Sequence, residues 1–238
     1  MIITAHQPLY MPWLGFFHKV ILADTICILD DVQFSDGDFI NRNKIKTAQG
    51  PKWLTVPINK KNHMNRKINQ IEINNNEWKL KHISLLRQAY SKTPYFETYI
   101  DKIENLFLES DYKYIIELDL KILQFLFADL EIKTNVVLSS SLNIEKKKSD
   151  LILSICKKLG ANMYISGMNG LDYLHVDKFI DEDIKIAIQN YKPFPYNQVH
   201  GAFTPNLSVI DLLFNAGPET RDIIMTGNAK VWNELLLA

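Results

Sequence analysis

Apolar residues at the start of the chain form two short runs with a longer helix-like stretch between them. The runs are residues 1–4 and residues 25–29 (TICIL), which are typical of buried strands, and residues 13–23 (WLGFFHKVILA) are typical of an apolar helix. A strand, a helix and a strand within about 30 residues predict a βαβ unit with two parallel strands. The loops that follow both strands then lie at one edge of a sheet.

The middle of the chain predicts a hairpin and then helices. Residues 31–46 (DVQFSDGDFINRNKIK) are typical of a polar loop, and the runs 53–58 (WLTVPI) and 68–73 (INQIEI) predict two strands that flank the polar tip KKNHMNRK. Apolar positions with a helical period predict three further helices, over residues 76–90, 95–108 and 112–130.

The last third of the chain returns to strands that alternate with helices. The predicted elements are a strand over 134–138, a helix over 149–159 that ends at Gly160, strands over 163–166 and 184–189, a helix over 208–215 with Ser208 as N-cap, and a helix over 230–237. The Pro- and aromatic-rich residues 191–206 predict a loop.

These elements predict one α/β domain over residues 1–238. Its fold is expected to be a Rossmann-like, mostly parallel sheet flanked by helices, with an inserted β-hairpin and a central helical segment at about residues 76–131. Sheets of this type bind ligands outside the carboxyl ends of their strands, near the point where the strand order reverses.

The composition argues against several classes of function. Lys+Arg and Asp+Glu both number 27, so the net charge is zero and gives no long-range attraction for nucleic acid or anionic lipid. The two cysteines, Cys27 and Cys156, have no metal-ligand spacing and lie in apolar runs, which predicts buried thiols in a reducing compartment. No apolar run is long enough to cross a membrane, and we expect a cytoplasmic protein without membrane insertion.

The stretch HQPLYMPW after the first predicted strand is the first candidate site. His6 is a candidate catalytic residue, as a general acid/base or as a donor to an oxyanion, because imidazole titrates near neutrality. Gln7 offers a donor and an acceptor, and Trp13 would form a pocket wall. Alternatively, His6 satisfies backbone groups beneath the loop and Trp13 fills the core.

A second candidate is the acidic pair Asp30 and Asp31, which ends the second predicted strand of the βαβ unit together with Gln33. Adjacent strand residues point to opposite faces, so at most one of the two carboxylates faces any one pocket. One of them would bind an amine or polarise His6. The other would cap a turn or pair with Arg42.

Two loops contain candidate anion-binding residues. Asn41 and Arg42 lie in the polar loop, where a guanidinium suits a phosphate or carboxylate, unless the loop is simply solvated. Ser166, Gly167 and Tyr173 follow a predicted strand, where glycines let backbone N–H groups approach an anion. This segment matches neither a Walker A sequence nor GxGxxG, and a plain turn is the alternative.

The predicted loop 191–206 is the last candidate. Its aromatic and amide side chains include Tyr196 and Gln198, residue types that bind sugars and nucleobases by stacking and directional hydrogen bonds. A proline-stiffened loop that packs on the core is the alternative. No HExxH, GxSxG or CxxC motif is present, and we expect no metal site.

Several of these stretches together resemble one family. HQPLYMPWLGFFHKV, LDDVQFS, INRNKIK, WLTVPI, YISGMNGLDYL and YNQVHGAFTPNLSVIDLLFNAG, in this order and over nearly the whole chain, resemble the WbqC-like protein family. Members of that family are typically encoded among bacterial genes for O-antigen and other surface polysaccharides. The resemblance implies that the pocket contains His6, Gln7, Pro8, Trp13, Asp30, Asp31, Gln33, Asn41, Arg42, Ser166, Gly167, Tyr173, Tyr196, Gln198 and Asp211.

A second resemblance covers only the opening. The strand, the His-containing loop and the following strand are similar to the start of pantothenate synthetases and related nucleotidyltransferases with an HxGH signature. Leu14-Gly15-Phe16 stands where the second half of that signature would lie, so its second histidine is missing. The resemblance therefore favours a related fold but not ATP-dependent adenylation.

The family resemblance implies an acyl or aminoacyl (glycyl-type) transfer to the amine of a nucleotide-linked amino-sugar in lipopolysaccharide O-antigen synthesis. The activated donor would be an acyl phosphate made from ATP or an aminoacyl-tRNA, and the zero net charge argues against tRNA. His6 would be the base or oxyanion donor, and Asp30 or Asp31 would hold the ammonium group. Arg42 would bind a phosphate, and Tyr196 with Gln198 would bind the sugar. The alternative is a non-catalytic sugar-nucleotide-binding or assembly protein.

Overall fold

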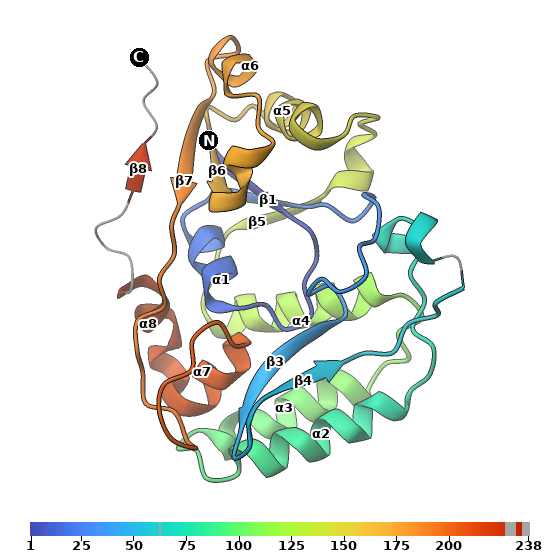
Figure 1. The fold of residues 1–238 in the computed structure, drawn as a ribbon, viewed down its shortest axis with the longest axis vertical. Coiled ribbons are helices and arrows are strands. Elements are labelled where there is room, and N and C mark those ends of the chain that lie inside the picture. Colours follow the sequence, from blue (N-terminus) through green and yellow to red (C-terminus); the bar gives the residue numbers. More distant parts are fainter. Residues whose placement is uncertain (62, 227–231, 235–238) are drawn as a thin grey trace.

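In the computed structural model, the chain forms a six-stranded sheet with the strand order β5-β2-β1-β6-β7-β8 (Figure 1). The structure describes residues 1–61, 63–226 and 232–234. The parallel strands are β1 (Ile2–His6), β2 (Thr25–Ile28), β5 (Asn135–Leu138), β6 (Met163–Gly167) and β7 (Lys185–Gln189). The edge strand β8 (Trp232–Glu234) is antiparallel to β7. The predicted α/β fold with a mostly parallel sheet is confirmed.

Helices cover both faces of the sheet because its strands are apolar on both sides. Ile26 and Ile28 in β2 pack into the larger core with α1 (Leu14–Ile21), whereas Cys27 between them packs into the smaller core with α5 (Lys148–Leu159) and α6 (Val176–Ile180). This alternation follows from the two-residue period of a strand. Cys27 and Cys156 are buried free thiols, as predicted.

The larger core also contains the helices that the sequence predicts in the middle and near the end of the chain. These are α2 (Glu77–Tyr90), α3 (Phe96–Leu108), α4 (Ile115–Asp129) and α7 (Val209–Ala216). A further helix, α8 (Thr220–Thr226), also packs against this core and was not predicted from the sequence. The predicted N-cap of α7 is confirmed, because Ser208 Oγ accepts a hydrogen bond from the backbone N–H of Ile210. In the described part of the chain, no helix is long and apolar enough to span a membrane.

The hairpin lies earlier in the chain than predicted. Residues 42–46 do not belong to a loop: β3 (Arg42–Thr47) and β4 (Gly50–Thr55) form an antiparallel pair that contacts α2 (Figure 1). The predicted strand over 68–73 is wrong for its first half, where Ile68–Gln70 form a 3₁₀ helix. The remaining pairing there consists of isolated bridges, Ile58 with Ile73 and Glu72 with Tyr114.

Residues 42–46 form a strand rather than the predicted loop because their side chains stack on a residue of the opposite strand. The Arg42 guanidinium and the Lys44 ammonium lie 4.4 Å and 4.8 Å from the centre of the Trp53 ring on the opposite strand. These cation–π contacts stabilise charged residues in β3 that the sequence pattern assigns to a loop. The predicted helix over 230–237 is also wrong for residues 232–234, which form β8, and its other residues lie outside the described part.

The strand order reverses between β1 and β6. From β1 the chain proceeds through α1 to β2 on one side, and from β6 it proceeds through α6 to β7 on the other. The two central strands, β1 and β6, pair in parallel with Thr4 opposite Ile165. The Thr4 hydroxyl also donates a hydrogen bond to the Ile165 carbonyl at 2.9 Å. The loops after β1 and β6 therefore diverge, and this divergence places a crevice at the carboxyl edge of the sheet.

Candidate functional site

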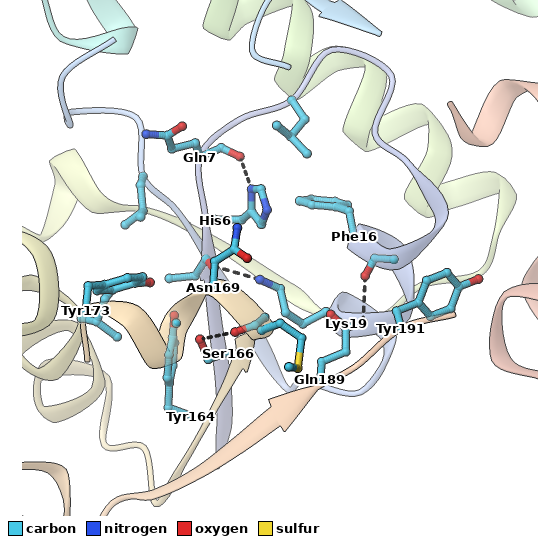
Figure 2. A pocket seen from close by; sticks show the side chains of 18 of the residues that line it. His6, Gln7, Phe16, Lys19, Tyr164, Ser166, Asn169, Tyr173, Gln189 and Tyr191 are labelled. Carbon is cyan, nitrogen blue, oxygen red and sulfur yellow. Dashed lines mark hydrogen bonds between the residues drawn. The ribbon is translucent and has the colours of Figure 1, made fainter. Parts of the chain in front are cut away.

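A cavity of about 820 Å³ lies at the carboxyl ends of β1, β6 and β7 (Figure 2). Six of the residues that the sequence singled out line it, namely His6, Gln7, Trp13, Ser166, Gly167 and Tyr173. We call this cavity the crevice. Its volume is in the range of sites that hold a small ligand.

His6 ends β1 and carries the imidazole of the crevice. Its Nδ1 lies 2.9 Å from the Gln7 carbonyl oxygen, which only accepts hydrogen bonds, so Nδ1 carries the proton and Nε2 has the free lone pair. Burial, together with the nearby Lys19 charge, lowers the pKa of His6 to about 3. The imidazole is therefore neutral near pH 7, with Nε2 as a proton acceptor.

Lys19 is a functional candidate that the sequence analysis missed. It lies on α1, lines the crevice, and donates from Nζ to the Ala5 carbonyl at 3.3 Å (Figure 2). The side chain is buried, which lowers the pKa of Lys19 to about 8, and no acidic residue in the described part of the chain forms an ion pair with it. The available signal was a lysine in the middle of the apolar stretch WLGFFHKVILA. A buried ammonium group without a counter-ion favours an anionic or strongly polarised ligand.

The wall formed by β6 contains two glycines, of which only Gly170 is required for close packing. A Cβ on Gly170 would lie 1.8 Å from Ser166 Oγ, so only glycine permits this approach of the turn to the strand. A Cβ on Gly167 would meet no atom within 4 Å, which shows that this position opens into the crevice. The Tyr164 and Tyr173 hydroxyls form a hydrogen bond at the same wall.

The opposite wall joins β7 to the start of α1. Gln189 Nε2 donates to the Gly15 carbonyl at 2.9 Å, and the Trp13 indole packs so closely over Gly15 that a Cβ there would lie 2.2 Å from the ring. Tyr191 packs edge-on against Trp13, with ring centres 5.8 Å apart. Its buried hydroxyl has no hydrogen-bond partner in the described part of the chain and points away from His6 and Lys19 (Figure 2), so Tyr191 contributes its aromatic ring to this wall.

Asp30 and Asp31 lie outside the crevice. Asp30 is buried and accepts hydrogen bonds from Ser139 Oγ at 3.1 Å, from the Ser140 backbone N–H at 2.9 Å and from Asn69 Nδ2 at 3.1 Å. Asp31 forms an ion pair with Lys67 at 3.7 Å. Both carboxylates thus hold together the loops that follow β2 and β5. The acidic residue that does line the crevice is Asp38, an exposed loop residue that the sequence analysis did not single out.

The structure also places Asn41 and Arg42 away from the crevice. Asn41 is buried, and its Nδ2 donates to the Val56 carbonyl at 2.8 Å. Arg42 donates to the Gly37 carbonyl and stacks on Trp53. Both residues line a separate cavity of about 430 Å³ beside the hairpin.

Tyr196 and Gln198 do not line the crevice but bind the buried carboxylate of Asp211 at the start of α7. Asp211 Oδ2 accepts from Tyr196 Oη at 2.7 Å and from Gln198 Nε2 at 2.8 Å, while its Oδ1 accepts from Tyr90 Oη at 2.8 Å. Lys46 Nζ donates to Gln198 Oε1 at 3.0 Å. This network fastens the loop 190–206, whose first residues line the crevice, to the larger core.

Asp119 on α4 is buried beneath the HQPLYMPW loop in an apolar environment. It borders a small cavity together with Pro8 and Leu9, and neither of its carboxylate oxygens has a hydrogen-bond partner among the described residues. Burial raises the pKa of Asp119 well above its ordinary value. Burial among apolar side chains therefore favours the protonated carboxyl group over the carboxylate.

Replacement of Asp119 by asparagine is expected to raise the free energy of unfolding at pH 7 by about 1–3 kcal/mol. The folded-state pKa is higher than the unfolded-state pKa, so the aspartate loses stability as pH rises above about 4, whereas asparagine does not. The gain should therefore shrink as pH falls toward 4. Urea denaturation at both pH values measures it, and exposed Asp222→Asn is the control. A variant that is less stable than wild type at pH 7 would contradict this account.

In the part of the chain that the structure describes, no three His, Cys, Asp or Glu residues are grouped so that they could hold a metal ion. The fold and the crevice define an α/β protein with its candidate site at the point where the order of the parallel strands reverses. The chain belongs to the WbqC-like protein family, whose sequence model matches residues 7–223.

One relative is the uncharacterized protein Rv1507c of Mycobacterium tuberculosis (strain ATCC 25618 / H37Rv). It is 31% identical over 219 residues, which cover 92% of this chain and 95% of the relative. No solved structure is significantly similar to the chain.

Proposed function

We propose that the protein transfers an acyl or aminoacyl group to the amine of a nucleotide-linked amino-sugar in the synthesis of a bacterial surface polysaccharide. The observation that carries this proposal is that one crevice contains both a neutral histidine with a free Nε2 lone pair and a buried lysine that forms no ion pair with any described acidic residue. Family membership supports the polysaccharide context.

The chemistry requires a proton acceptor and a cation, and the crevice offers both. The sugar amine attacks the carbonyl carbon of the donor, the new C–N bond forms, and the amine proton moves to His6 Nε2. The oxygen of the tetrahedral intermediate gains negative charge, which the Lys19 ammonium stabilises. The C–O bond to the leaving group then breaks, and the imidazolium returns its proton to the leaving oxygen. Burial is the main reason for the low pKa of His6, and the nearby Lys19 charge lowers the pKa further. Oxyanion charge that forms beside Lys19 offsets this second, smaller contribution, so His6 becomes a stronger base during the reaction.

A third side chain of the crevice, Asp38, can bind the activated donor. Asp38 lines the mouth and is exposed, so its carboxylate can bind the ammonium group of an aminoacyl donor without a large desolvation cost. In this proposal Asp38 takes the role that the sequence analysis gave to Asp30 or Asp31, whose oxygens are already bound to Ser139 and other groups.

The test is turnover by purified protein with an amino-sugar nucleotide and glycine, supplied either with ATP or as glycyl-tRNA, with mass spectrometry to detect the glycylated sugar. We expect product with one donor. Binding of the sugar nucleotide without product from either donor would instead support the rival function, a non-catalytic sugar-nucleotide-binding or assembly protein.

The proposed role of Lys19 predicts how kcat depends on pH. Lys19 has a pKa of about 8 and acts as a cation, so kcat should fall as pH rises above about 8. Lys19→Met should lower kcat by about ten- to a hundredfold and should remove this alkaline limb. Lys121→Met, on the exposed side of α4, is the matched control. An alkaline limb that persists in Lys19→Met would contradict the role of Lys19.

A further inference from the structure

A second hollow of about 920 Å³ lies beside the crevice at the same edge of the sheet. The two hollows share Val32, Lys148 and Leu151 as lining residues, so they are adjacent compartments separated by these side chains. The segments that line it are the loop after β2 with Asp31, Val32 and Gln33, residues 65–70, and residues 140–151, which lead into α5. We call it the basic hollow.

The charge of this hollow is exceptional for a chain with a net charge of zero. Five basic residues line it against two acidic ones, namely Arg66, Lys67, Lys146, Lys147 and Lys148 against Asp31 and Glu145. Lys67 is paired with Asp31, and Lys146 lies near Asp150. In the described part of the chain, Arg66, Lys147 and Lys148 have no ion-pair partner.

The neutral groups of the hollow add to its capacity for an oxyanion. Asn65, Gln70 and Asn143 also line the hollow, and their side-chain amides supply further hydrogen-bond donors. Cations that converge on a concave surface bind a compact polyanion better than a flat surface does, because the charges reinforce one another near the low-dielectric wall. A diphosphate group is such a ligand.

We infer that the basic hollow binds the diphosphate of a nucleoside diphosphate, and that the sugar attached to it extends past Lys148 into the crevice. This inference rests on the proposed function and adds the location of the phosphates. It assigns phosphate binding to Lys147, Lys148 and Arg66 in place of Arg42, which lines a different cavity. The neutral chain as a whole and the concave shape favour a diphosphate over an extended nucleic acid.

The test measures binding of inorganic pyrophosphate by calorimetry at low ionic strength. The double variant Lys147→Gln/Lys148→Gln removes two charges of the hollow and keeps the length of the side chains. The control Lys133→Gln/Lys185→Gln removes two exposed lysines that adjoin the amino ends of β5 and β7, at the opposite edge of the sheet. We expect affinity to fall about tenfold in the first variant and less than about twofold in the control.

Three results would overturn the inference: no pyrophosphate binding by the wild-type protein, an equal loss in both double variants, or a bound pyrophosphate that uridine diphosphate does not displace although total tRNA does. The last result would indicate a nucleic-acid surface. Arg66→Gln provides an independent variant and should also weaken pyrophosphate binding.

Turnover separates this inference from the proposed function. Pyrophosphate binding that depends on Lys147 and Lys148, without any product from either donor, would leave the phosphate site in place and reject the transfer reaction. Product formation with the same KM for the sugar nucleotide in both double variants would support the transfer and reject the phosphate site.

Discussion

Substitution of His6 by asparagine is expected to lower kcat for glycyl transfer by about 10²–10⁴-fold, with little change in melting temperature. Asparagine Nδ2 can still donate to the Gln7 carbonyl, as imidazole Nδ1 does at 2.9 Å, so the turn after β1 is retained. The substitution removes Nε2, the only part of the side chain to which the proposed mechanism assigns a proton transfer. Steady-state kinetics and thermal unfolding of the same preparation measure both effects.

The matched control for this substitution is His175→Asn, because His175 is exposed and lies outside the crevice. It should leave kcat within about twofold of wild type. If His6→Asn unfolds at a much lower temperature than wild type, His6 is a structural residue. If it retains kcat, the proton acceptor is another group.

The second large effect concerns stability. Asp211→Ala should lower the free energy of unfolding by about 3–5 kcal/mol, because it leaves the hydroxyls of Tyr90 and Tyr196 and the amide of Gln198 buried without their acceptor. For a chain of this size the melting temperature should fall by roughly 6–20 °C. Asp211→Asn keeps one acceptor oxygen and should lose less.

Chemical denaturation of Asp211→Ala, with Asp222→Ala as an exposed control, measures this loss. A change below about 1 kcal/mol would show that the donors find other partners and that the network does not hold the loop 190–206. The experiment also bears on the crevice, because Tyr191 lies in that loop and lines the site.

The sequence predicts the sheet well because its strands are marked by local patterns. The run TICIL forms β2, buried on both faces, and Gly160 ends α5 with a positive φ of 70°, as a C-cap glycine does. These elements are determined by residues that are neighbours in the sequence. The parallel βαβ unit and the ligand edge then follow from general rules of connection.

The hairpin and part of the candidate site depend instead on contacts between distant residues. β3 is polar in sequence, and its charged residues Arg42 and Lys44 are held by contacts with Trp53 on β4, and Arg42 also by a hydrogen bond to the Gly37 carbonyl. The side chains of Tyr196 and Gln198 are suited to binding a sugar and equally suited to forming a buried hydrogen-bond network. Their hydrogen bonds to Asp211 show that they form the network. Residue type therefore predicts the capacity for hydrogen bonding but not the partner.

Lys19 illustrates a different kind of omission. Its neighbours in α1 are apolar and buried, and a lysine at such a position either extends to solvent or is held inside the protein. The sequence pattern indicates the helix but does not distinguish these outcomes. The structure does, because the Lys19 side chain ends at the Ala5 carbonyl inside the crevice.

The reversal of strand order between β1 and β6 also has a consequence for the synthesis of the chain. The crevice is lined by residues from Ala5 to Tyr191, and the two central strands are joined by a hydrogen bond between residues 161 positions apart. A nascent chain on the ribosome therefore carries His6 and Lys19 long before it has the opposite wall. Until translation has passed Tyr191, the histidine and the lysine have no complete pocket, so the site is assembled only after the residues of β7 and Tyr191 have been made.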